Sequence, residues 1–146
     1  MILTALYFMC GITYVVLGII TLLNDPKNKS NRLFFVICMN LAFWALMTFF
    51  MNRSVDAKAA SDFYLYSTFA WATFYCLLVH FIIILTGKEG FLKKRFAYLI
   101  FYFPALASIY LYAFKPETAQ HFVKTNMGWI YITSTDRGFI WSNFYQ

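Results

Sequence analysis

Side chains that could take part in chemistry are few in this 146-residue sequence, and three of them fall on one helical face. Thr73, Cys76 and His80 are spaced i, i+3 and i+7 inside an apolar stretch, so a helix brings them to the same side. One interpretation is a polar stripe that faces a helix bundle and contacts a ligand or a proton. The other is a neutral histidine that bonds to a neighbouring helix. A metal site at Cys76 and His80 needs more ligands than can be found in the sequence, so no metal is expected.

Four further side chains stand out in or near apolar stretches. Asn40 lies near the middle of one stretch, where an unbonded amide is costly, so it either joins two helices or contacts a ligand. Trp71 and Tyr75 are one helical turn apart, which is typical of a packing or lipid-facing surface. The other interpretation is an aromatic pocket for an apolar or flat ligand near the outer leaflet. Trp129 is expected on an outer lid. The ligand-binding candidates are Asn40, Trp71, Tyr75, His80 and Trp129.

Catalytic and cofactor motifs are absent from the sequence. No Asp or Glu lies inside any of the four long apolar stretches, so a carboxylate proton relay cannot be built from them. No glycine-rich phosphate loop, no His-Glu-x-x-His pair and no nucleophile–base set appears. We therefore expect no catalytic residues, no enzyme activity and no cofactor in this chain.

The balance of residue types indicates a lipid environment. Apolar residues make up 62% of the chain and charged residues 12%, whereas soluble domains average about 45–50% and about 25%. A chain this short has too little interior to hide so much apolar surface from water. The net charge of +6 would suggest nucleic acid in a soluble protein, but here the basic residues lie between apolar stretches. The expected partner is therefore the lipid bilayer and not nucleic acid.

Four uncharged stretches are long enough to cross that bilayer. They cover residues 2–23, 33–51, 63–86 and 96–114, and a span needs about 17–25 residues for a hydrocarbon core near 30 Å. Lipid leaves no partner for an open backbone, so these stretches are predicted to be helices. The predicted fold is an all-α, integral-membrane multi-helix bundle of about four transmembrane helices.

Two local features refine the first and third helices. Ser61 or Asp62 is expected to cap the third helix, because a short polar side chain can accept from its first free N–H groups. Gly11 and Gly18 are seven residues apart on one stripe of the first helix. They are expected to allow close approach of a second helix.

Lysine and arginine positions predict the orientation. The loops 24–32 and 87–95 hold seven basic residues in 18 positions, against five in the 43 positions of 52–62 and 115–146. Membrane proteins keep their basic loops in the cytoplasm. The loops 24–32 and 87–95 are therefore expected to be cytoplasmic, and the N-terminus is expected outside.

The segment 115–138 is then extracellular. Residues 129–133 are rich in β-branched and aromatic types and predict a short strand. From about residue 139 the sequence becomes aromatic again, which is typical of the interfacial start of a fifth helix. We expect Gln146 to be an artificial or partial end at the mouth of that helix.

Several loose motifs are shared with one bacterial family. They are Asn28 to Phe35 leading to Ala42-Phe43-Trp44, His80 to Gly87, Tyr102-Phe103-Pro104, Gly128-Trp129 and Trp141 to Tyr145. On these motifs the chain resembles the N-terminal seven-transmembrane sensor region of histidine kinases, which also occurs on diguanylate cyclases and related signalling proteins. The resemblance covers essentially the whole chain but only the first half of that region, so no phosphotransfer residue can be carried over.

The resemblance implies a function and a location. The chain would be the membrane-embedded input of a two-component-type signalling protein in the bacterial cytoplasmic (inner) membrane. It would receive a small-molecule or membrane-borne signal, act as a homodimer in the full-length protein, and pass the signal to a cytoplasmic output that is absent from this chain. The main alternative is a fragment of a multi-span transporter or channel, which needs a hydrated path with polar residues on several helices. A membrane-embedded enzyme is a weaker alternative, because no acid–base or metal set is present.

Overall fold

Four helices and a two-stranded hairpin make up the described part of the chain. The computed structural model describes residues 2–88, 90, 95–113, 122–125 and 128–131. In chain order the elements are α1 (Ile2–Asn24), α2 (Lys29–Arg53), α3 (Ala57–Leu85), α4 (Arg95–Ala113), β1 (Phe122–Thr125) and β2 (Gly128–Tyr131). The predicted fifth helix from about residue 139 lies outside these residues, as does most of the segment 115–138.

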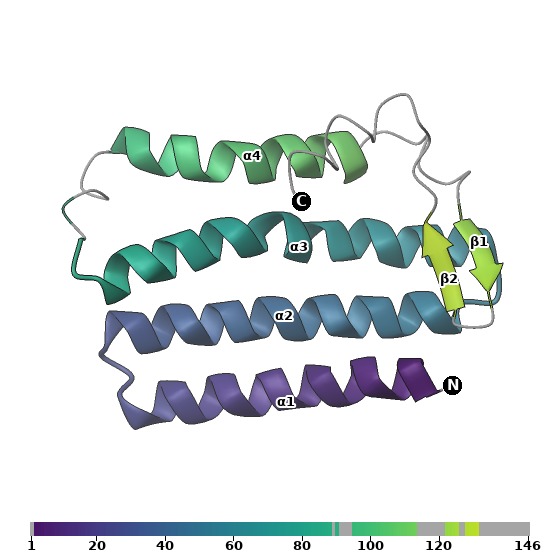
Figure 1. The fold of residues 1–146 in the computed structure, drawn as a ribbon, viewed down its shortest axis with the longest axis horizontal. Coiled ribbons are helices and arrows are strands. Elements are labelled where there is room, and N and C mark those ends of the chain that lie inside the picture. The colour runs from purple at the N-terminus through teal and green to yellow at the C-terminus, as the bar shows by residue number, and fades with distance from the viewer. Residues whose placement is uncertain (1, 89, 91–94, 114–121, 126–127, 132–146) are drawn as a thin grey trace.

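The four helices lie side by side in one layer, in chain order (Figure 1). Each packs mainly against its neighbours in the sequence, and the short connections at 25–28 and 54–56 make successive helices antiparallel. The hairpin lies where α2 ends and α3 begins (Figure 1). We call this the hairpin end of the bundle. The opposite end, where α1 and α3 finish, is called the basic end after its lysine-rich and arginine-rich connections.

Small side chains fill the contacts between helices, and large apolar side chains face outward. The buried small residues include Cys38, Ala42, Ala45, Ala60, Ser61, Ser67, Thr68, Ala70, Ala72, Cys76, Ala105 and Ser108. Large side chains such as Leu6, Ile20, Phe43 and Phe103 are exposed on the outside of the layer. In water so much exposed apolar surface would promote association, whereas helices in lipid pack through small residues and turn large ones to the acyl chains. The chain is therefore an all-α membrane protein.

Three of the described helices are long and apolar enough to cross a membrane. They are the segments Leu3–Asn24, Lys29–Arg53 and Ala57–Leu85. The fourth, α4, has 19 residues and carries a shorter apolar segment, Tyr98–Tyr112, with Pro104 inside it. The predicted all-α helical bundle is confirmed, and three of its four helices reach spanning length.

The third helix begins earlier than the sequence predicted. α3 starts at Ala57 and not at residue 63. Asp56 is its N-cap, because one carboxylate oxygen accepts the Ala59 N–H at 2.8 Å. The expected caps Ser61 and Asp62 therefore lie inside the helix, and Ser61 is buried there. With 29 residues, α3 is about 43 Å long at 1.5 Å per residue, so it extends beyond a hydrocarbon core near 30 Å.

The second helix also starts outside its apolar stretch. α2 begins at Lys29 and not at residue 33, because the Asn28 side chain accepts the Ser30 N–H at 2.8 Å and caps the helix. Hydropathy marks the part of a helix that can lie in lipid, whereas caps decide where the helix begins. The difference between the predicted and observed starts has this origin in both helices.

The hairpin includes the predicted strand. β2 covers Gly128–Tyr131 and so begins one residue before the strand predicted at 129–133. It pairs antiparallel with β1, a strand that was not predicted from the sequence. Gly128 has φ +124°, and a Cβ added there would overlap the Asn52 side chain at the end of α2. A glycine is therefore required where the hairpin backbone meets α2.

Candidate functional site

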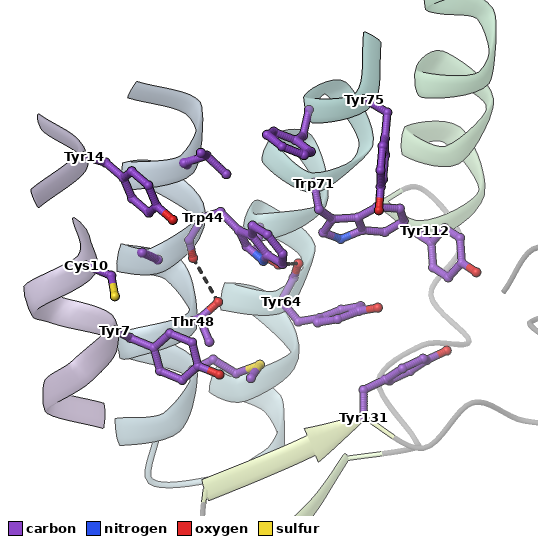
Figure 2. A pocket seen from close by; sticks show the side chains of 15 residues that line it. Tyr7, Cys10, Tyr14, Trp44, Thr48, Tyr64, Trp71, Tyr75, Tyr112 and Tyr131 are labelled. Carbon is purple, nitrogen blue, oxygen red and sulfur yellow. Dashed lines mark hydrogen bonds between the residues drawn. The ribbon is translucent and has the colours of Figure 1, made fainter. Parts of the chain in front are cut away.

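A cavity of about 650 Å³ occupies the hairpin half of the helix layer. Its fifteen lining side chains come from all four helices and from β2, nine of them are aromatic, and none is charged (Figure 2). They are Tyr7, Cys10, Tyr14, Leu41, Trp44, Ala45, Thr48, Met51, Tyr64, Ser67, Trp71, Phe74, Tyr75, Tyr112 and Tyr131. The volume lies within the range of about 300–1,000 Å³ that is common for small-molecule sites.

The first wall of the cavity is built by α1 and α2. Tyr7, Cys10 and Tyr14 project from one side of α1 because i+3 and i+7 spacing places them on one face. Trp44 and Thr48 face them from α2 (Figure 2). The Thr48 hydroxyl donates to the Trp44 carbonyl at 2.9 Å, so its proton is directed to the backbone and its lone pairs remain for other contacts.

The second wall is built by α3 and the end of α4. Trp71 and Tyr75 are one turn apart on α3 and both line the cavity (Figure 2). The Trp71 ring meets Tyr112 of α4 edge to face, with 5.4 Å between centroids. The Ser67 hydroxyl donates to the Tyr64 carbonyl at 2.7 Å. The polar groups of this wall are thus mainly phenol and indole groups on large aromatic rings.

The hairpin closes the cavity at the end of the bundle. The Tyr131 ring stacks on Tyr64 of α3, with 4.9 Å between centroids and 20° between planes, and burial raises the pKa of the Tyr131 phenol above its ordinary value. Trp129 does not line the cavity; its Nε1–H donates to the Ser54 carbonyl at 2.9 Å, and the Lys124 ammonium lies 5.6 Å from its ring centroid. Trp129 therefore holds the hairpin on the bundle, and Tyr131 reaches the cavity.

The cavity extends from the hairpin end to about the middle of the helices. Its lining on α2 runs from Leu41 to Met51, which is about 15 Å along the axis at 1.5 Å per residue. That length is about half of a hydrocarbon core near 30 Å. Two of its lining side chains, Trp44 and Tyr75, are 42% and 48% exposed.

Asn40 lies beside the cavity and not in its lining. Its amide Nδ2 donates to the Thr73 hydroxyl at 2.8 Å, and Thr73 in turn donates to the Phe69 carbonyl at 2.7 Å. This is the bond between two helices that the first interpretation of Asn40 requires. The Asn40 Oδ1 atom is buried and has no hydrogen-bond partner within the described residues.

His80 lies nearer the basic end, away from the cavity. Its Nδ1 is 3.1 Å from the Tyr102 hydroxyl of α4, and one turn earlier the Cys76 thiol donates to the Phe101 carbonyl at 2.9 Å. Both contacts join α3 to α4. Within the part of the chain that the structure describes, no group of three His, Cys, Asp or Glu side chains could hold a metal ion.

The structure thus brings together two of the five predicted site residues, Trp71 and Tyr75, and places Asn40, His80 and Trp129 in contacts that join elements. The tyrosines of α1 were not among the residues predicted from the sequence. A signal for them exists, because Tyr7 and Tyr14 share the helix stripe of the two glycines that were expected to face a second helix. Tyr112 and Tyr131 carry no comparable local signal, since tertiary packing alone brings them to the cavity.

Comparison of the chain with protein-family models, curated proteins and solved structures finds no match. The class of protein therefore rests on the fold and the surface described above. The chain is a multi-helix membrane protein with an uncharged aromatic cavity in one half of its helix layer.

Proposed function

We propose that this chain is the membrane-embedded input of a bacterial signal-transduction protein, and that the aromatic cavity receives its signal. The observation that carries the proposal is the composition of the cavity wall: every described helix and the hairpin contribute side chains to it. A ligand bound there touches all of these elements at once. It can therefore favour one packing of the helices over another, which is how a ligand shifts a population between two states.

The proposed orientation puts the cavity in the outer half of the bacterial cytoplasmic membrane. The basic loops at 24–32 and 87–95 would face the cytoplasm, which places the hairpin end outside. A small-molecule or membrane-borne signal would then enter on the outer side. The output, a kinase or cyclase in the cytoplasm, would follow later helices, and the full-length protein would act as a homodimer.

Reporter fusions test this orientation directly. A reporter that is active only in the cytoplasm is joined after residue 28 or after residue 90, and a reporter that is active only outside is joined after residue 55. All three fusions are expected to be active. As a further control, the reporter that is active only outside is joined after residue 90. Activity of that fusion would contradict the proposed orientation and the proposed position of the cavity in the outer half of the membrane.

The sensory function is tested first by the coding sequence that follows Gln146. Three more apolar spans and then a histidine-kinase or cyclase domain are expected. In that full-length protein, Tyr75→Ala is expected to change output activity by about fivefold or more, the lower end of typical coupling between sites. Tyr66→Ala is the matched control, because Tyr66 is on the same helix and similarly exposed (55% against 48%) but does not line the cavity. Equal effects of the two variants would contradict the proposal.

A transporter or channel fragment is the second candidate. The observation that favours it is the buried Oδ1 of Asn40, which has no hydrogen-bond partner among the residues that the structure describes. A polar atom without a protein partner in the middle of a bundle is typical of a path for water or substrate. Reconstituted full-length protein that carries solute across a vesicle membrane, with Asn40→Leu blocking that flux, would support this candidate over a sensor.

A further inference from the structure

The chemistry of the cavity wall narrows the class of ligand. We propose that the cavity binds an uncharged, planar ring compound that carries acceptor oxygens, such as an aromatic ketone or a quinone. The inference rests on the proposed function only in treating this cavity as the site that receives the signal. The binding itself follows from the charge, shape and hydrogen-bonding groups of the wall.

Charge is the first restriction. None of the fifteen lining residues is an acid, a lysine, an arginine or a histidine, and the cavity lies in the hairpin half of a membrane helix bundle. An anion there would have no cationic partner, and its loss of hydration would not be offset. A cation would be attracted by the aromatic faces, but it too would lack a counter-charge because no carboxylate lines the wall. An uncharged ligand avoids both costs.

Shape is the second restriction. Two indoles, six phenols and one phenyl ring line the cavity, and their flat faces favour stacking or edge contacts with another flat ring. The stacked pair Tyr64–Tyr131 and the edge-to-face pair Trp71–Tyr112 already use this geometry in the wall. A volume of about 650 Å³ leaves room for a fused two-ring or three-ring compound with substituents.

Hydrogen bonding is the third restriction. The Trp44 indole can only donate, and the phenols of Tyr7 and Tyr14 on the same wall can donate as well as accept. Donors in an apolar cavity are costly unless an acceptor meets them. Carbonyl oxygens at the edge of a ring supply acceptors without adding charge. A ring with such oxygens therefore fits the wall better than a hydrocarbon of the same size.

Binding of four probes with one three-ring framework tests the inference. The purified 146-residue chain is placed in lipid nanodiscs and titrated by calorimetry, and the heat measured with empty nanodiscs is subtracted. The probes are 9,10-anthraquinone, anthracene, anthraquinone-2-sulfonate and a trimethylammonium derivative of anthraquinone. Anthraquinone is expected to bind saturably, with anthracene weaker by about fivefold or more because its hydrogen bonds are lost. Both charged probes are expected to bind more weakly than anthraquinone.

Two adjacent residues provide a matched pair of variants. Trp44 lines the cavity and Phe43 does not, although they are 42% and 41% exposed. Trp44→Leu is expected to raise the Kd for anthraquinone about tenfold, through loss of one ring contact and one N–H donor, and Phe43→Leu to leave it unchanged. Trp44→Phe keeps a ring and removes only the donor, so it is expected to raise the Kd by about fivefold even if the leucine variant folds poorly.

Several results would overturn the inference. The first is that the trimethylammonium or the sulfonate probe binds most tightly of the four. The second is that anthracene binds as tightly as anthraquinone. The third is that the Trp44 and Phe43 variants change the Kd for anthraquinone equally. Failure of the proposed function looks different. In that case anthraquinone binds as described, but the Tyr75 and Tyr66 variants change the output of the full-length protein to the same extent.

Discussion

Replacing Gly18 by alanine should separate α1 from α2, whereas the same change at Gly11 should not. Both glycines lie on one stripe of α1 that faces α2. A Cβ at position 18 would lie 2.9 Å from the Cys38 Cβ, which is fixed to the backbone and cannot turn away. A Cβ at position 11 would lie 3.6 Å from the nearest atom, the Ala42 carbonyl oxygen, which is ordinary contact. The two sites therefore differ in packing but share a helix.

The expected magnitude follows from these distances. Each substitution gains helix propensity, at most about 1 kcal/mol for glycine to alanine. Only Gly18→Ala also forces extra volume into a tight contact, which costs about 1–3 kcal/mol. Because the propensity gain is common to both, the difference between the two variants isolates the packing cost. Gly18→Ala should thus be less stable than Gly11→Ala by about 1–3 kcal/mol.

Reversible unfolding in mixed micelles, with sodium dodecyl sulfate as denaturant and far-UV circular dichroism as the signal, measures this difference. A second substitution at Cys38 identifies the contact. Cys38→Gly removes the Cβ that Gly18→Ala would meet, so a double-mutant cycle should show coupling of about 1–2 kcal/mol. Cys38→Ala keeps that Cβ and should show almost none. Equal stability of Gly18→Ala and Gly11→Ala, or equal coupling with both Cys38 variants, would refute the argument.

Two other contacts make similarly specific predictions. Thr73→Val should destabilise the bundle by about 1–3 kcal/mol in the same unfolding assay, because it leaves the Asn40 Nδ2 group without its acceptor. Asn40→Leu should cost less than Thr73→Val, since it also removes the Oδ1 atom that has no partner within the described part of the chain. The opposite order would contradict this prediction. Trp129→Phe should weaken docking of the hairpin by about 0.5–1.5 kcal/mol through loss of the bond to the Ser54 carbonyl. Faster amide hydrogen exchange at residues 122–125 in this variant would show the weaker docking. Unchanged exchange would argue that the bond from Trp129 to the Ser54 carbonyl does not hold the hairpin.

The helices could be predicted from the sequence because lipid imposes a strict rule on apolar stretches. A backbone in hydrocarbon must satisfy its own hydrogen bonds, so the stretches at 2–23 and 33–51 indicate helices without further information. The same rule says nothing about where a helix continues into water. For this reason α2 and α3 begin earlier than predicted, directly after their N-caps Asn28 and Asp56.

The cavity was only partly predictable. Trp71 and Tyr75 could be paired from their spacing, because residues one turn apart share a helix face. Tyr112 and Tyr131 lie far from them in the sequence, and only the packing of α4 and the hairpin brings them close. Tyr131 also depends on a close approach that Gly128 permits beside Asn52. Contacts of that kind are set by the whole fold, so a local pattern cannot report them.

The two halves of the bundle differ in how their helices are joined, and this difference bears on how a signal would travel. Toward the basic end, α1 meets α2 through the tight Gly18–Cys38 contact, and α3 is joined to α4 by the Cys76–Phe101 and His80–Tyr102 bonds. Toward the hairpin end, side chains of the same four helices line a cavity. Tightly packed contacts tend to switch between discrete arrangements and resist gradual deformation. Under the proposed function and orientation, a ligand in the cavity would therefore move the hairpin ends of the helices about their joined basic ends. The displacement would then reach the basic end of the bundle as a change in helix tilt.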